Sequence, residues 1–295
     1  MKNIIIYPFL FIIGMLGFVF FISFPKLFVF KWTTEPEHLV ISSESFFSAF
    51  SDSYKVLTTP TKWTFIDSWM KDEVMERYIY SLQIMGLSIL FTIFIGCIIA
   101  CFIIFIPYKW KAPLKDGLNF LEGLPDLFIL FLLQMGIFTL YKEFGIKLFY
   151  MYGLFGAKPY FFPMVVISIL PSLFFAQYLL KVMEEEMDKQ YILLGRAKGL
   201  SNLHLFKNHL IRNIYPVVMI YFKTIIFMVL TNLVLVEHMF ILDGYVNELY
   251  NVLTTKRNVL DIVFYTLMLL TPILFLEFIL NISAKSLRKI RGVQL

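Results

Sequence analysis

Charged residues are scarce in this chain of 295 residues, where they make up 16% of the sequence against 59% for hydrophobic residues. A soluble protein of this length needs far more polar surface to cover its core. The composition therefore indicates an integral membrane protein. Its apolar runs reach about twenty residues, which predicts helices, because the strands of a membrane barrel need only about ten. The predicted fold class is all-α.

Cysteine is nearly absent. Cys97 and Cys101 are the only two, and they stand four residues apart in one apolar run. They would share a helix face and match neither a disulfide framework nor a metal motif. His238 stands beside Glu237 with no further ligand at a suitable spacing. We predict no metal site.

Motifs for catalysis are also missing. The sequence has no Gly-x-x-x-x-Gly-Lys-Ser/Thr phosphate loop, no Gly-x-Ser-x-Gly and no His-Glu-x-x-His. The run Glu184 to Glu186 lacks the Arg that would complete the Glu-Glu-x-x-x-Arg pattern of membrane metalloproteases. We therefore predict no catalytic residue and no enzyme activity in this chain. The net charge of +5 is explained by basic cytoplasmic loops, so no nucleic acid is expected as a partner.

Six apolar segments are long enough to cross about 30 Å of hydrocarbon as helices. They are residues 4–24, 79–106, 118–141, 161–180, 214–236 and 262–283. The third is interrupted near its start by Glu122, Pro125 and Asp126. The first is longer than the apolar part of a signal peptide and lacks a cleavage site, so residues 1–24 are interpreted as an uncleaved span.

The predicted organisation places a small external segment between the first span and a membrane core. Residues 25–78 are polar and are expected to form a partly helical cap, residues 79–291 the core with five spans, and residues 284–295 a basic tail. Lys and Arg are denser in the loops on the side of the N-terminus than in the opposite loops. This distribution predicts that both termini and the loop 181–213 are cytoplasmic.

The loop 181–213 is a charged island between two apolar runs. Residues 187–198 contain no proline, so a helix can continue through them. Gly199 then occupies the position of a helix-ending glycine, and Ser201 that of an N-cap for a second helix over 202–213. The sequence thus predicts a helix-glycine-helix elbow suited to a partner protein, although an ordinary solvated connector would have the same features.

The loop carries Tyr-x-x-x-x-Arg-Ala-Lys-Gly-Leu-Ser from Tyr191 to Ser201, followed by His-x-x-Arg-Asn-x-x-Pro-Val from His209 to Val217. This order resembles the cytoplasmic loop of permease subunits of ATP-binding-cassette importers, in the peptide and nickel branch. Gly195 departs from that pattern, because a helix-forming residue usually stands there. The Pro-Gly-Asp-Pro turn of the branch is also missing after the first span. The matching residues, with Gly195 added, are the candidate ATPase-coupling residues Tyr191, Gly195, Arg196, Ala197, Lys198, Gly199, Leu200, Ser201, His209, Arg212 and Asn213; Pro216 and Val217 extend the match.

This resemblance implies a type I importer permease in the cytoplasmic membrane of a prokaryote, surrounded by lipid. The implied partners are a second permease subunit in a heterodimer, two ATPase subunits and an external binding protein. ATP and Mg would be bound by the ATPases, and this chain would bind no cofactor. The implied activity is import of peptides, nickel or another small polar solute by alternating access, coupled through the loop 181–213.

Ionisable residues within spans are costly and suggest function. Glu122, Asp126, Lys223 and Glu277 form a candidate pathway or gate, in which Lys223 and Glu277 are at a depth that allows an ion pair. A purely structural pair with the other charges reaching the interface remains open. Glu237 and Gly244 resemble a motif that this permease family carries after the fifth span. They are candidates for the external mouth of the transport pathway.

Two other functions remain open from the sequence. A secondary transporter or channel acting alone would be expected to show inverted repeats, and none is evident. A permease of the same family used for export or sensing is compatible with all the motifs.

Overall fold

The computed structural model describes residues 13, 14, 17, 20, 21, 23–31, 38–58, 70–145, 153, 158–254 and 259–291. Most of the predicted first span, 4–24, lies outside the described residues, as do 292–295 of the predicted tail. Within the described part, five helices are long and apolar enough to cross a membrane: Asp72–Phe105, Asp126–Phe144, Phe161–Met187, Leu203–Met239 and Asp261–Leu280.

The chain forms two compact units. One comprises residues 1–78 and 245–271, and the other comprises residues 79–244 and 272–295. Helix α4 (Asp72–Phe105) and helix α12 (Val259–Arg291) each contribute to both.

The first unit contains the only described strands, in the segment predicted as an external cap. A turn of 3-10 helix, η1 (Phe24–Leu27), leads into β1 (Phe28–Lys31), which pairs antiparallel with β2 (His38–Ile41). Helix α2 (Ser43–Thr58) follows, and the Ser42 side chain accepts a hydrogen bond from the backbone N–H of Ser45 at its start. The helical part of the cap was predicted and the hairpin was not, since its strands are only four residues long.

A tyrosine cluster organises the rest of the first unit. Tyr245, at the start of α11 (Tyr245–Thr254), is fully buried and donates a hydrogen bond to the backbone carbonyl of Tyr265 at 3.1 Å. Tyr78 packs edge-on against Tyr245, with ring centroids 5.0 Å apart. Arg77 and Glu248 add an ion pair at 2.7 Å. These contacts hold α11 to the helix ends that flank it within this unit.

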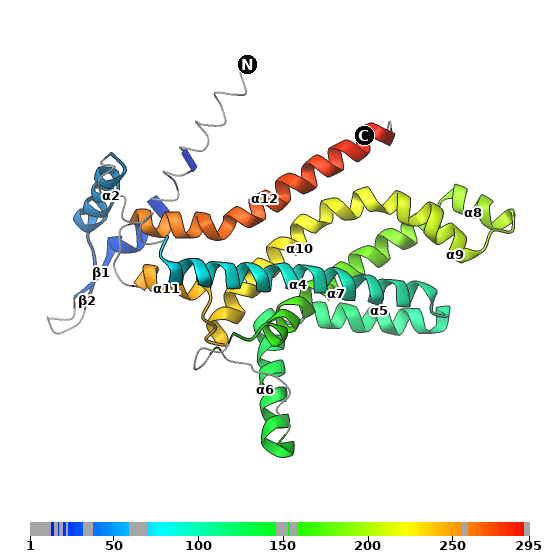
Figure 1. Ribbon diagram of the computed structural model, residues 1–295, viewed down its shortest axis with the longest axis horizontal. Coiled ribbons are helices and arrows are strands. Elements are labelled where there is room, and N and C mark those ends of the chain that lie inside the picture. Colours follow the sequence, from blue (N-terminus) through cyan, green and yellow to red (C-terminus); the bar gives the residue numbers. More distant parts are fainter. Residues whose placement is uncertain are drawn as a thin grey trace. The chain divides into compact units, whose positions relative to one another are not determined.

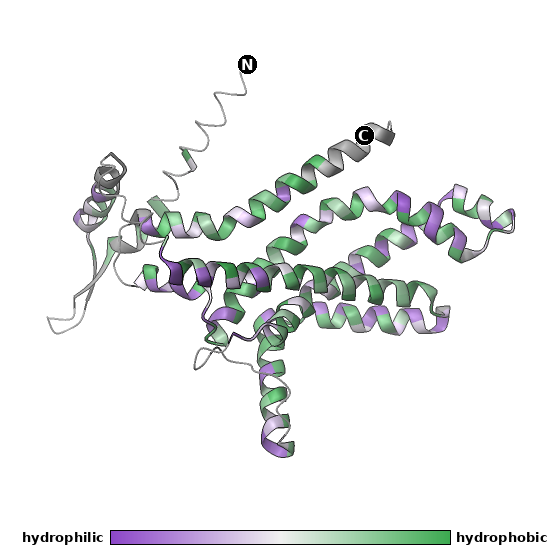
Figure 2. Cartoon of the chain, in the orientation of Figure 1, coloured by the Kyte–Doolittle hydropathy of each residue, from purple (hydrophilic) through white to green (hydrophobic). Residues whose placement is uncertain are grey.

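The second unit holds most of the helices. In chain order it contains the rest of α4, α5 (Tyr108–Glu122), α6 (Asp126–Phe144), α7 (Phe161–Met187), α8 (Gln190–Ala197), α9 (Asn202–Leu205), η4 (Phe206–Leu210), α10 (Ile211–Met239) and the end of α12. Apolar residues cover most of α4, whereas hydrophilic residues gather around α8 and α9 (Figure 2).

Helices α7 and α10 lie side by side and form the centre of this unit (Figure 1). Their aromatic contacts follow an antiparallel order along the pair. Phe162 meets Phe240 with ring centroids 5.3 Å apart, and Tyr178 stacks on Tyr221 at 3.7 Å. Apolar side chains from α7 fill the space between, including Ile167, which is fully buried.

Helix α4 packs against α7 through small residues. Gly96 lies so close to α7 that an added Cβ would come within 2.6 Å of the Phe175 ring. The hydroxyl of Ser168 donates to the backbone carbonyl of Ser88 at 3.1 Å, and both serines are fully buried. Small residues allow this close approach, and interhelical hydrogen bonds are the usual substitute for the hydrophobic effect between helices in lipid.

The predicted third span, 118–141, is not one helix. Helix α5 ends at Glu122, the chain turns through Gly123, Leu124 and Pro125, and α6 starts at Asp126 (Figure 1). Pro125 cannot donate to the preceding helix, and Asp126 is favourable in the first turn of the next one. The residues that interrupted the apolar run are therefore the residues that divide it.

Candidate functional site

The predicted coupling loop begins with a break that the sequence did not show. Helix α7 ends at Met187, and Lys189 is extended, with φ −71° and ψ 146°, before α8 starts at Gln190. The prediction of a helix continuing through 187–198 is wrong at residues 188–189. The break reorients the chain, so that α8 forms a separate short helix.

Helix α8 ends in the glycine elbow that the sequence predicted. Gly199 has φ +79°, a left-handed conformation that glycine adopts without steric cost. Its N–H donates to the Arg196 carbonyl at 2.9 Å, and the N–H of Leu200 donates to the Gly195 carbonyl at 3.1 Å. This pair of hydrogen bonds is a Schellman motif, which fixes the direction in which the chain leaves α8.

The next helix is capped by Ser201, as predicted. The Ser201 hydroxyl accepts the backbone N–H of His204 at 3.3 Å, and the Ser201 carbonyl accepts that of Leu205 at 3.1 Å. The helix then continues without a break as α9, η4 and α10, so the predicted second helix and fifth span are one. Its residues Phe206–Leu210 are wound as π-helix, a local widening that is frequent at functional sites.

Gly195 has a structural reason in this chain. A Cβ at this position would come within 2.5 Å of the Leu205 side chain, which is 4% exposed. The glycine therefore lets α9 pack directly on α8. Gly195 thus closes the elbow at a position where the family pattern has a helix-forming residue.

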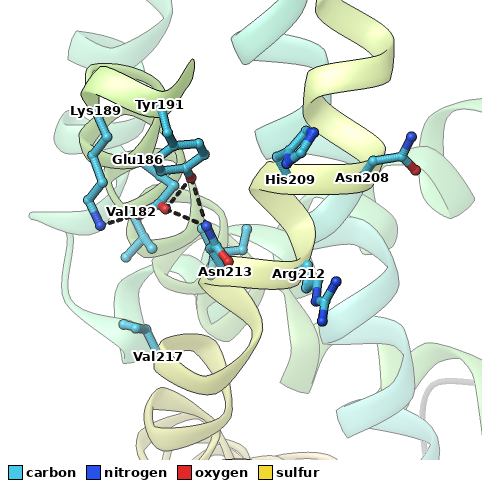
Figure 3. Close-up of a pocket in the computed structure, with 10 residues that line it drawn as sticks. Val182, Glu186, Lys189, Tyr191, Asn208, His209, Arg212, Asn213 and Val217 are labelled. Atoms are coloured by element: carbon cyan, nitrogen blue, oxygen red, sulfur yellow. Dashed lines mark hydrogen bonds and ion pairs between the residues drawn. The ribbon is translucent and has the colours of Figure 1, made fainter. Parts of the chain in front are cut away.

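A buried carboxylate ties the elbow to the two long helices (Figure 3). Glu186, near the end of α7, is 7% exposed. Its carboxylate accepts hydrogen bonds from the Tyr191 hydroxyl and from the side-chain amide of Asn213, the latter at 3.1 Å. Lys189 pairs with the other carboxylate oxygen at 2.5 Å. Elements α7, α8 and α10 thus meet at one acidic side chain.

Tyr191 is locked in its neutral form by this network. Burial, the hydrogen bond to Glu186 and the negative charge of Glu186 raise the pKa of Tyr191 to about 12. Asn213 also donates to the Tyr191 oxygen at 2.9 Å. The hydroxyl therefore remains a donor to Glu186 throughout the physiological pH range.

The network borders an open pocket of about 630 Å³. Tyr191, Asn213, His209 and Arg212, all predicted site residues, lie around it, together with Val182, Glu186, Lys189, Asn208, Ile214 and Val217 (Figure 3). The structure therefore brings together the Tyr191 and His-x-x-Arg-Asn parts of the motif, which are far apart in sequence.

Arg196 lies in a different place. It lines a small apolar pocket of about 110 Å³ together with Leu205, Phe206 and the end of α4. There the Phe105 and Phe206 rings lie 5.1 Å apart. Ala197 and Lys198 are exposed at the end of α8, and Leu200 is 38% exposed. One part of the motif therefore lies around the pocket beside Glu186, namely Tyr191, His209, Arg212 and Asn213. The part formed by Ala197, Lys198 and Leu200 faces outward.

The predicted gate residues are only partly brought together. Lys223 of α10 and Glu277 of α12 form the expected ion pair, with side chains 63% and 26% exposed. Glu122 ends α5 and Asp126 starts α6, and within the described part of the chain no ion pair joins either acid to that pair.

The predicted external-mouth residues meet in a closed turn. Glu237 is fully buried, and a Cβ on Gly244 would overlap its carboxylate. The backbone N–H of Leu242 donates to the Glu237 carbonyl at 3.0 Å, and Ile241 adopts φ 51°. Glu237 and Gly244 therefore pack against each other inside the turn that follows α10.

Glu186 was not predicted as a site residue, although a signal for it existed. On α7 the buried residues Leu179, Met183 and Glu186 follow one another at intervals of four and three, which is the spacing of one helix face. Continuing that apolar face past Met183 selects Glu186 from the three consecutive glutamates. Another unpredicted contact, between Lys115 and Glu184 at 2.6 Å, joins α5 to α7.

Comparisons with known proteins agree with this architecture. The family described as binding-protein-dependent transport system inner membrane component matches residues 92–289. The metal-staphylopine import system permease protein CntB of Staphylococcus aureus is 28% identical over 125 residues, which are 42% of this chain and 38% of CntB. The chain thus matches well under half the length of this curated relative.

Two solved structures share the fold. A chain of the MetNI methionine ABC transporter, in inward-facing conformations, matches with a TM-score of 0.59 and 12% identity, over 74% of this chain and 99% of that one. A chain of an amino acid ABC transporter with histidines matches with a TM-score of 0.51 and 13% identity, over 72% and 92%. These likenesses confirm the predicted type I importer permease fold.

Proposed function

Because this chain belongs to the family of binding-protein-dependent transport system inner membrane components, we propose that separate ATPase subunits drive it through residues 188–210, here called the coupling segment. The observation that carries the proposal is the capped elbow at Gly199 and Ser201, joined to the long helices through Glu186. Because the end of α8 and the start of α9 are both capped, the elbow resists deformation. A force on it would therefore be transmitted to the long helices that it joins.

The proposed mechanism follows from how the segment is attached. Helix α7 enters it and α10 leaves it, and Glu186 and Asn213 connect these helices at that end. Movement of the elbow by closing ATPases would therefore displace α7 and α10 together and shift the bundle between inward- and outward-facing states. ATP and Mg belong to the ATPases in this mechanism, and Arg196 and Lys198 would be polar contacts to them.

The proposed assembly contains a second permease subunit, two ATPases and an external binding protein. Support for a second permease comes from α6, whose apolar residues are largely exposed in the single chain. The proposed orientation has both termini in the cytoplasm and the turn at Gly244 on the external side, as the distribution of Lys and Arg indicates.

The proposed cargo is a peptide, nickel or another small polar solute. Its support is the resemblance of the motif at Tyr191–Val217 to the peptide and nickel branch. The likeness to CntB, whose name gives a metal complex as cargo, adds metal complexes to this class.

The first experiment is purification of the chain from its native membrane in mild detergent, followed by identification of the proteins that accompany it. We expect ATPase subunits, and we expect them to be lost when residues 193–201 are scrambled. A wild-type chain that purifies alone and moves solute without ATP would overturn the proposal in favour of a stand-alone transporter.

A matched pair of glycine variants tests the elbow itself. Gly199→Val and Gly145→Val both place a β-branched residue at a helix end with positive φ, and neither site has a neighbour within 4 Å. Both variants carry a backbone cost of about 1–2 kcal/mol. We expect Gly199→Val to abolish the ATP hydrolysis stimulated by binding protein and a defined peptide mixture, and Gly145→Val to retain it. Equal activity of the two variants would remove Gly199 from the mechanism.

A further inference from the structure

A proline in the middle of α7 leaves one backbone carbonyl without its helical partner. Pro171 lies inside the helix and is buried, and it has no N–H to donate to the carbonyl of Ile167, four residues before it. In a hydrocarbon environment water cannot replace the lost partner, so a neighbouring group must do so.

That neighbouring group comes from α10. The side-chain amide of Asn232 donates to the Ile167 carbonyl at 3.2 Å, and Asn232 is 1% exposed. Because a carbonyl can only accept, the amide nitrogen must face it. A polar side chain of α10 thus occupies the place of the N–H that Pro171 removed.

This hydrogen bond differs from the other contacts between the two helices. On either side of it α7 and α10 meet through apolar side chains, among them the ring pairs Phe162 with Phe240 and Phe175 with Phe222. Ring contacts tolerate small axial slips, whereas an amide–carbonyl hydrogen bond weakens steeply with distance and angle. The Asn232 bond therefore fixes the register of the pair within the bundle, as Asn213 with Glu186 fixes it at the coupling segment.

We propose that Asn232 is a positioning residue that completes the hydrogen bonding of α7 at Pro171 and so makes α7 and α10 move as one body. The movement it would transmit is that of the coupling segment, and this part of the inference rests on the proposed function. Asn232 would act through the Ile167 carbonyl and does not touch the solute.

The structural test is a distance within α7 of the purified chain. Spin labels at the exposed positions Phe161 and Lys181 flank Pro171, about 30 Å apart along a straight helix, after Cys97 and Cys101 have been replaced by alanine. We expect Asn232→Leu to broaden the distance distribution. Thr231→Leu is the control, because Thr231 is exposed and its hydroxyl bonds to its own helix at Phe227.

Restoring the backbone donor makes the test specific. In the Pro171→Ala variant the backbone regains an N–H that can donate to the Ile167 carbonyl, so Asn232→Leu should have no further effect on the distance in that background. An unchanged distribution in the single Asn232→Leu variant would overturn the proposal. So would an equal broadening with and without Pro171, because that would be a general packing defect.

The functional test is performed on the complex that purifies with this chain. We expect Asn232→Leu to lower stimulated ATP hydrolysis several-fold at equal protein in the membrane, because movement of the coupling segment would no longer be passed jointly to α7 and α10. Pro171→Ala should not restore it, because the regained N–H donates within α7 and does not join α7 to α10. Recovery in the double variant would overturn the view that the two helices move as one body. A wild-type preparation without ATPase subunits would count against the proposed function alone, because the distance measurement does not need them.

Discussion

Helices α7 and α6 are both apolar enough to cross a membrane, yet their surroundings differ completely. In the most apolar stretch of α7, 67% of the residues are buried within the chain, against 6% in α6. The difference lies in small and polar residues. Helix α7 offers serines and a proline-released carbonyl to its neighbours, whereas the outer residues of α6 are large and apolar, such as Phe131 and Phe138.

This contrast shows that apolar composition alone does not determine whether a helix packs inside its own chain. In lipid, an apolar side chain gains little by leaving the bilayer for another helix, and association depends on close packing and hydrogen bonds. The composition of α7 therefore marks a helix held by its own chain. That of α6 marks a helix left for lipid or another subunit to cover.

The largest expected difference comes from truncating one aromatic ring in each helix. Phe175→Ala in α7 removes a ring that is 1% exposed and packs against Gly96 and Phe222. We expect it to lower the free energy of unfolding by about 3–5 kcal/mol through the cavity that it leaves. Phe131→Ala in α6, where the ring is 55% exposed, should change it by less than about 0.5 kcal/mol.

Reversible unfolding in mixed micelles measures the free energy of unfolding of Phe175→Ala and Phe131→Ala. A comparable loss at Phe131 would show that α6 is packed as tightly as α7 in the isolated chain. The contrast between the two helices would then disappear.

Two glycine-to-alanine changes should alter the stability of the protein in opposite directions. Gly96→Ala places a methyl group 2.6 Å from Phe175 and 3.1 Å from the Ser172 carbonyl, and overpacking of this kind costs about 1–3 kcal/mol. Gly136→Ala in α6 meets nothing within 4 Å and should stabilise the helix by about 0.5–1 kcal/mol. Thermal unfolding of the two variants in the same detergent checks the signs.

Gly86→Ala sharpens this comparison within a single helix. Gly86 lies on α4, like Gly96, but has no neighbour within 4 Å. We expect it to behave like Gly136. Destabilisation at Gly86 would assign the Gly96 result to α4 as a whole instead of its contact with α7.

A smaller loss than those at Phe175 and Gly96 is expected at Tyr191, where the coupling segment is attached to α7. Tyr191→Phe removes the hydrogen bond to Glu186 and should cost about 1 kcal/mol. Because the pKa of Tyr191 is raised to about 12 in the folded protein, this stabilisation is fully present below the unfolded pKa of about 10. It is lost as the pH rises through 12.

Unfolding of wild type and Tyr191→Phe across this alkaline range measures the difference. A difference that already falls away below pH 9 would mean that another group controls the network. Tyr191 would then not be held neutral by Glu186.

The elbow was predictable because its chemistry is local. Gly199 and Ser201 stand within three residues of each other, a glycine that tolerates positive φ followed by an N-cap, and the structure realises both. Apolar length likewise located the five described spans, because the bilayer sets the length of a helix that crosses it, although the one predicted over 118–141 starts at Asp126.

Other features depend on partners distant in sequence and could not be predicted locally. The donor for the Ile167 carbonyl is 65 residues away, at Asn232. The spacing of the apolar face of α7 selects Glu186 from three consecutive glutamates, but its hydrogen-bond partner Asn213 is 27 residues away. The hairpin β1–β2 is too short to give an alternating pattern that stands out.

The turn after α10 limits the order in which this sequence can change over evolution. Any side chain at position 244 would meet the carboxylate of the buried Glu237, so replacement of Gly244 requires that carboxylate to move. Loss of the acid opens space at that position. A side chain at 244 is therefore accommodated more easily after residue 237 has become shorter, so the order of the two changes affects their cost.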